Sequence, residues 1–172
     1  SAYGLSEIFR NDIKNARVVA CPGCYPTAAL LSIIPLIEGG IISLEDIIID
    51  AKSGVSGAGR SNKEELMFSE VSESMKPYNI GKHRHTPEIE KVIEKISGRE
   101  IKINFTPHLI PINRGELLTI YLKTIDGYSA EHAQTCLDSF YKNDRYVHVS
   151  KKRVPSETSN VRGSNNCLIS VF

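Results

Sequence analysis

The sequence predicts an α+β domain in which helices pack on a mixed, largely antiparallel sheet. Three observations lead to this prediction. The 172 residues are 41% hydrophobic and 24% charged, which is typical of a globular domain with a substantial core. Strand-like and helix-like segments follow one another without a regular βαβ alternation. No internal repeat or low-complexity segment interrupts them, so we interpret residues 1–172 as a single domain.

The first half of the chain contains a strand-turn-helix unit. Pro22 and Gly23 form the turn, and Gly39 ends the helix that follows it. Strands are expected where β-branched residues cluster, and helices where longer periodic or apolar runs occur. In chain order, we predict a helix over residues 6–14, a strand over 17–20, a helix over 28–37 and a strand over 47–51.

The second half contains two helices with their own start signals. Thr86 can cap the first, Pro87 fits its first turn, and Ser129 can cap the second. Pro107 makes the segment between two of the predicted strands an extended connection. In chain order, we predict a partly helical segment over 61–74, helices over 87–96 and 130–142, strands over 101–105, 117–124 and 146–149, and a final strand-like run over 167–172.

The composition argues against several classes of function. The formal net charge is +1, which gives no support for nucleic-acid or membrane-surface binding. No apolar run reaches the roughly 18 residues that a membrane helix needs. Four cysteines without a secretion signal are typical of a reducing compartment, so we expect a cytoplasmic protein.

Cys24 lies where the predicted turn meets the predicted helix. The free N–H groups and the positive dipole end of a helix favour thiolate over thiol. The thiolate is the nucleophilic form, so we predict covalent chemistry at Cys24. The spacing from Cys21 leaves two other functions open: a redox dithiol, and a zinc site completed by His83 and His85. A small buried core residue is the structural alternative.

A dense polar cluster immediately precedes the Thr86 helix. It consists of His83, Arg84 and His85. One imidazole can take the thiol proton of Cys24 and return it later, and Arg84 can hold an anionic group. The same three residues also fit a solvated loop, in which the histidines only pair with carboxylates.

Two further segments can meet a ligand. The glycine-rich loop over 53–59 has the order Gly-x-x-Gly-x-Gly, which differs from the dinucleotide fingerprint, yet a phosphate or a nicotinamide can approach such a backbone. Arg114 lies on an extended connection and can present its guanidinium to a carboxylate or phosphate. Both segments also fit ordinary surface loops.

Taken together and in order, these blocks resemble the N-acetyl-γ-glutamyl-phosphate reductases. The matching pieces are 3–5, 22–27, 53–60, 83–88, 105–109, 113–115, and 163–165 with Cys167. The resemblance implies an enzyme of arginine biosynthesis, related to aspartate-semialdehyde and glyceraldehyde-phosphate dehydrogenases, with a fold like the C-terminal domain of glyceraldehyde-3-phosphate dehydrogenase. It also implies a homo-oligomer that forms through the sheet, and a nucleotide-binding domain and a C-terminal helix that are not part of this chain.

The resemblance also implies a mechanism and its residues. In such enzymes a thiolate attacks an acyl phosphate, phosphate leaves, and NADPH delivers hydride to the thioester. Cys24 is then the nucleophile and His83 the acid/base, while His85, Arg84 and Arg114 bind the substrate, with no metal. The nicotinamide side of NADP(H) is expected at Ser53, Gly54, Ser56, Gly57, Ala58, Gly59 and Asn165. A lysine-pathway homologue that acts on another acyl phosphate is an alternative within the same chemistry.

Overall fold

The computed structural model describes residues 1–151 and 153–172. Its main sheet has four strands in the order β4-β5-β3-β6. β3 runs parallel to β5 and antiparallel to β6, and β4 is antiparallel to β5, so the sheet is mixed as predicted. In chain order, these strands are β3 (Ile48–Ser53), β4 (Lys76–Pro77), β5 (Asn104–Leu109) and β6 (Glu116–Tyr121).

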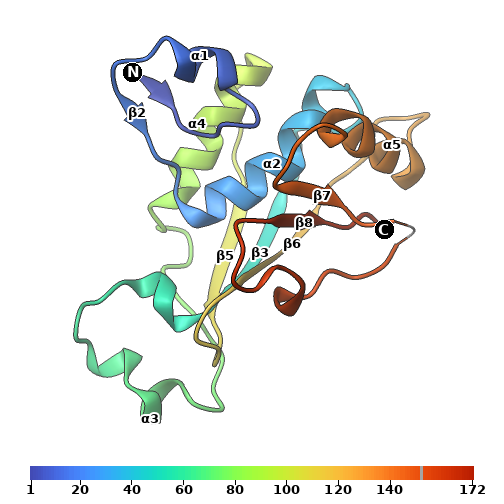
Figure 1. The fold of residues 1–172 in the computed structure, drawn as a ribbon. Helices are drawn as coiled ribbons and strands as arrows, with labels where there is room; N and C mark the ends of the chain where they lie inside the picture. The colour runs from blue at the N-terminus through green and yellow to red at the C-terminus, as the bar shows by residue number, and fades with distance from the viewer. Residues whose placement is uncertain (152) are drawn as a thin grey trace.

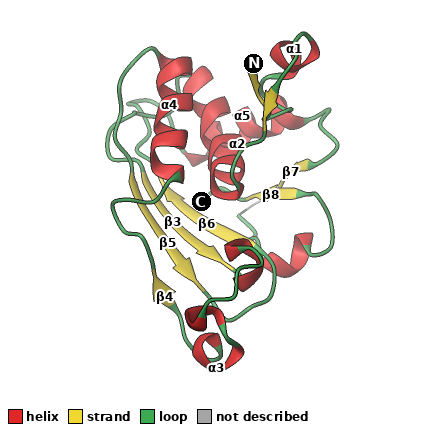
Figure 2. Cartoon of the chain, turned by 90° about the vertical axis from the view of Figure 1, so that its left-hand side faces the viewer, coloured by secondary structure: helices red, strands yellow, loops and turns green. Residues whose placement is uncertain are grey.

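Helices cover one face of this sheet (Figure 2). α2 (Cys24–Glu38) lies in the middle and packs against α4 (His85–Ser97), α5 (Ala130–Tyr141) and β6. Because it has neighbours on several sides, α2 is apolar around most of its circumference, whereas α4 and α5 each have one apolar and one polar face. The core forms where these helices meet the inward-facing side chains of β3 and β5.

Two small parallel sheets flank the helices (Figure 1). β1 (Ala2–Tyr3) pairs with β2 (Val19–Ala20), and α1 (Arg10–Lys14) joins them near α4. β7 (Val147–Val149) pairs with β8 (Cys167–Ile169) beside α5. The remaining short elements are η1 (Val55–Ala58), η2 (Glu64–Leu66), α3 (Phe68–Val71) and η3 (Thr158–Val161).

Some boundaries differ from the sequence prediction. α4 begins at His85 with Arg84 in the N-cap position, so Thr86 is not the cap. The expected connection through Pro107 is part of β5, because the Pro107 carbonyl accepts the Tyr78 N–H at 3.0 Å and its backbone polar groups thus face the short edge strand β4. Ser129 is the N-cap of α5, as predicted. Within residues 1–151 and 153–172, no helix is long and apolar enough to cross a bilayer.

Candidate functional site

Cys24 is the first residue of α2 and is exposed to solvent. The Gly23 carbonyl accepts both the backbone N–H and the hydroxyl of Thr27, at 3.0 and 2.9 Å. The Gly23 N–H donates to Glu88 Oε1 at 3.0 Å, and the Tyr3 hydroxyl donates to the same oxygen at 2.7 Å. The turn that carries Cys24 is therefore held by Glu88 of α4, and Tyr3 of β1 binds the same carboxylate oxygen.

His85 lies directly against this turn. A Cβ atom on residue 23 would lie 2.3 Å from His85 Nε2, so only glycine fits there. The His85 ring is buried, and among the described residues its Nδ1 has no hydrogen-bond partner. Burial lowers the pKa of His85, although the charge of Glu88 opposes the shift. His85 is thus an imidazole placed next to the peptide that precedes Cys24.

His83 lies in an aromatic cage. The rings of Tyr25, Tyr78 and Phe105 meet it edge-on, with centroid distances of 5.8, 5.5 and 5.2 Å. His83 Nδ1 accepts the backbone N–H of His85 at 3.1 Å. Burial, followed by the neighbouring His85, lowers the pKa of His83 to about 4. The ring is therefore neutral at neutral pH and supports the backbone at His85.

Glu116 belongs to the site but was missed by the sequence analysis. It begins β6 and pairs in register with Ser53 at the end of β3. Its carboxyl lies beside Cys24, and its Oε2 is buried without a hydrogen-bond partner among the described residues. Burial raises the pKa of Glu116 to about 7. Residues 116, 118 and 120 lie on the same, inward face of β6, because side chains alternate along a strand. A glutamate at the first of these otherwise apolar positions was the signal that could have revealed it.

The Cys24 thiol is less acidic than the sequence predicted. The backbone N–H groups of Cys24 and Tyr25 lower its pKa, as expected for a helix start. Burial, followed by the charge of Glu116, outweighs them and raises the pKa of Cys24 to about 12. Cys24 is exposed as a residue, yet its thiol is partly desolvated by the surrounding protein. At rest Cys24 is therefore a thiol, and covalent chemistry needs a base beside it.

The glycine-rich loop is joined to the segment that carries Arg114. The N–H groups of residues 54, 55 and 56 donate to the carbonyls of residues 115, 112 and 113, at 3.0, 2.9 and 3.0 Å. A Cβ atom on Gly54 would lie 2.8 Å from the Ile112 oxygen, which explains the glycine. Ser53 and Gly54 are buried, whereas Arg114 and the four residues 56–59 are exposed. The structure thus brings Arg114 to the predicted cofactor loop.

Two other predicted ligand-binding residues lie at the surface. Arg84 is exposed at the start of α4. Its positive charge adds to the effect of burial, which is the larger cause, in lowering the pKa of both His83 and His85. Asn165 is exposed before β8, and its side chain has no hydrogen bond among the described residues. The structure places Arg84 at the site but records no contact that brings Asn165 to it.

The zinc and dithiol alternatives both require Cys21 and Cys24 to act together. Among residues 1–151 and 153–172, no three His, Cys, Asp or Glu side chains form a group that could hold a metal ion. Cys21 and Cys24 are both exposed and both free. The Cys2His2 module therefore lacks the ligand cluster it requires.

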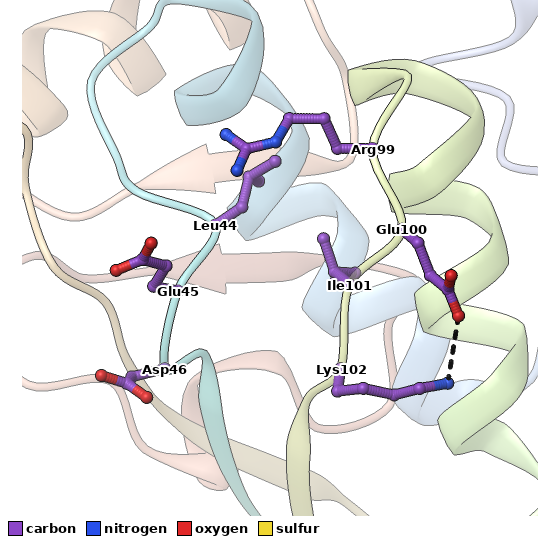
Figure 3. Close-up of a pocket in the computed structure, with 7 residues that line it drawn as sticks. All are labelled: Leu44, Glu45, Asp46, Arg99, Glu100, Ile101 and Lys102. Atoms are coloured by element: carbon purple, nitrogen blue, oxygen red, sulfur yellow. Dashed lines mark ion pairs between the residues drawn. The ribbon is translucent and has the colours of Figure 1, made fainter.

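A shallow polar depression lies at the opposite end of β3 and β5 from Cys24 (Figure 3). It is lined by Leu44, Glu45, Asp46, Arg99, Glu100, Ile101 and Lys102. Lys102 pairs with Glu100 at 4.0 Å, and the lining carries both cations and carboxylates. The depression holds none of the candidate site residues.

Known proteins share the sequence and the fold of this chain. The family described as semialdehyde dehydrogenase, dimerisation domain, matches residues 24–172. The chain is 52% identical over 165 residues to an N-acetyl-gamma-glutamyl-phosphate reductase of Lachnoclostridium phytofermentans, which covers 96% of the chain and 48% of the relative. It is 47% identical over 170 residues to a probable chloroplastic reductase of the same name from Arabidopsis thaliana, covering 99% of the chain and 42% of the relative.

The fold is also that of a solved structure. The crystal structure of aspartate semialdehyde dehydrogenase II from Vibrio cholerae matches with a TM-score of 0.74 at 15% identity, over 98% of this chain and 57% of that one. The predicted α+β fold and the resemblance to the reductases are thereby confirmed. The chain spans about half the length of the curated relatives it matches. It belongs to the semialdehyde dehydrogenase dimerisation-domain family.

Proposed function

We propose that this chain is the thiol-bearing part of an NADPH-dependent reductase that converts N-acetyl-γ-glutamyl phosphate to the semialdehyde. The observation that carries the proposal is the placement of Cys24: it is exposed at a helix start, with a buried imidazole at the preceding glycine and a buried carboxyl beside its sulfur. Relatives at 45–52% identity bear the name of this reductase. Because they are about twice as long, the proposal assigns to this chain the acyl-transfer site and the loop on the nicotinamide side, and not the whole reductase.

Each residue at the site has its own role in the proposed reaction. Cys24 attacks the acyl carbon and forms a thioester as phosphate leaves. Arg84 and Arg114 are exposed cations that can hold the phosphate and the substrate carboxylate. His85 lies against Gly23, the residue before the nucleophile, and is proposed to contact the substrate. An acid/base role for His83 stays a prediction, and its caged ring and occupied Nδ1 favour a supporting role instead.

The exposed glycine loop fits the expected cofactor. Its residues 53–59, together with Asn165, would hold the nicotinamide side of NADP(H), which supplies the hydride that reduces the thioester. Residues 56–59 are exposed, Gly59 has a φ of +82°, and no atom lies within 4 Å of a Cβ built there. A flat ring can therefore approach this backbone closely.

A second copy of the chain is proposed to pack on the uncovered face of the main sheet. Ile48 and Tyr121 are exposed on this face, and the family is described as a dimerisation domain. The compartment proposed is the cytoplasm, where the four free cysteines stay reduced.

The proposal is tested by acylation of the thiol. The chain is incubated with acetyl phosphate and then analysed by intact and peptide mass spectrometry. We expect a single acyl adduct on Cys24, which is absent in Cys24→Ala and retained in Cys21→Ala. Equal dependence on both cysteines would support the dithiol alternative. A comparison of acyl phosphates of different chain length separates the arginine-pathway from the lysine-pathway substrate.

A further inference from the structure

We propose that Glu116 is a second catalytic residue, which accepts the proton of the Cys24 thiol and passes it to the leaving phosphate. This inference rests on the proposed function and names the group that activates its nucleophile. It goes beyond the histidines on which the sequence analysis relied.

The fold places the Glu116 carboxyl against the reacting sulfur. Its register pair, Ser53, is the last residue of β3, so Glu116 lies at the end of the strands where α2 begins. Its side chain lies on the same face of β6 as Leu118 and Ile120, and α2 packs on β6. The titratable groups that face it are Cys24 from α2, Cys167 from β8, and the phenols of Tyr25 and Tyr78.

The electrostatic surroundings suit proton transfer. Among the described residues Glu116 makes no ion pair, and its buried Oε2 has no hydrogen-bond partner. The Cys24 thiol lies within hydrogen-bonding reach of the same carboxyl, so a donor for proton transfer is already in place. With its pKa raised to about 7, the Glu116 carboxyl can both accept and donate a proton near neutral pH.

The proposed step balances its atoms and charges. As the bond from Cys24 sulfur to the acyl carbon forms, the S–H bond breaks and the proton moves to the Glu116 carboxylate. When the bond from that carbon to the phosphate oxygen breaks, the same proton moves to the departing oxygen. Phosphate thus leaves as hydrogen phosphate, Cys24 carries the thioester, and Glu116 is ionised again. No oxidant or reductant takes part in this half of the reaction.

Two reactions of the same sulfur test the inference. Alkylation by iodoacetamide requires only a thiolate, whereas acylation by acetyl phosphate also requires a proton for the leaving group. Glu116→Gln keeps the shape of the side chain and removes its charge and its proton transfer. At pH 8 we expect alkylation of Cys24 to become about tenfold faster, and acylation of Cys24 to become at least about tenfold slower. Peptide mass spectrometry assigns each product to its cysteine.

A matched control is available on α4. Glu90 is another partly buried glutamate, and its Oε1 accepts the Ile103 N–H at 3.1 Å. Glu90→Gln is expected to leave both rates unchanged. Glu116→Asp retains a carboxyl at a longer distance from the sulfur. Its acylation rate is expected to lie between those of Glu116→Gln and the unsubstituted chain. It therefore provides a second test if the glutamine variant folds poorly.

The possible outcomes separate the inference from the proposed function. If Glu116→Gln accelerates both reactions, Glu116 only suppresses the thiolate and the inference is overturned. It is equally overturned if both rates stay unchanged. If the unsubstituted chain forms no acyl adduct on Cys24 while its alkylation still responds to Glu116→Gln, the proposed function itself has failed.

Discussion

The two faces of the central sheet give polar side chains opposite environments. On the outer face, Lys52 Nζ lies 2.7 Å from one oxygen of Asp50, and His108 Nδ1 lies 3.2 Å from the other. On the inner face, Glu116 is partly buried near α2, with its Oε2 atom buried and no ion pair among the described residues. The outer charges neutralise one another near water, whereas the inner carboxyl retains its proton to about pH 7. The helix layer therefore sets the environment of the proposed reactive groups as well as forming the core.

The largest expected effect is a loss of stability on the inner face, where side chains are packed in the core, compared with the outer face. Ile49 is fully buried and Ile48 is 41% exposed, although they are neighbours in β3. Ile49→Ala is expected to lower the free energy of unfolding by about 2–5 kcal/mol, because it leaves a cavity under the helices. Ile48→Ala is expected to lower the free energy of unfolding of a single copy by less than about 1 kcal/mol. Urea denaturation measures both, and equal losses would contradict the assignment of faces.

The next largest expected effect is the dependence of stability on pH that Glu116 causes on the inner face. The pKa of Glu116 is raised from 4.5 to about 7, so folding favours its protonated form. The stabilisation is complete below pH 4.5 and is lost as the pH rises through 7, an effect on the order of 3 kcal/mol. His83, with its pKa lowered to about 4, changes stability in the opposite direction as the pH falls from 6.5.

The contribution of Glu116 to stability is measured by comparing the free energy of unfolding with and without this carboxyl at two pH values. Urea unfolding of the unsubstituted chain and of Glu116→Gln at pH 5 and pH 8 gives the difference between them at each pH. We expect the glutamine variant to gain relative stability as the pH rises. A difference that is the same at both pH values would show that the Glu116 carboxyl is not desolvated.

A smaller effect is expected from the contacts that hold the Cys24 turn. Tyr3→Phe removes the hydroxyl that donates to Glu88 and is expected to reduce stability by about 1 kcal/mol. It should also slow acylation of Cys24, because Glu88 Oε1 binds the Gly23 N–H. Tyr128→Phe, at an exposed tyrosine outside the main sheet, is the matched control and should change neither quantity. Thermal unfolding and acylation rates measure both.

The smallest effect is expected on the outer face. Lys52→Ala removes the cation that pairs with Asp50. Partly exposed ion pairs contribute less than about 1 kcal/mol, so urea denaturation should show a loss within that limit. Acylation of Cys24 should remain unchanged. A marked loss of acylation would mean that the two faces are coupled through the sheet.

The sequence by itself determined the local features of this protein. Pro22 and Gly23, followed by an apolar run, predicted that Cys24 begins a helix, and Ser129 marked the start of α5. These predictions succeeded because turns, caps and apolar periodicity depend on neighbouring residues only. The resemblance to the reductases likewise depended on short ordered motifs.

Only the tertiary structure decided what surrounds the thiol. It set His85 rather than His83 against Gly23, and it placed Glu116 beside Cys24. It also reversed the expected acidity of the thiol, because burial and a carboxylate from a distant strand outweigh the local helix start. Desolvation and charge proximity arise where α2 crosses β6, and the residues that meet there are far apart in the sequence.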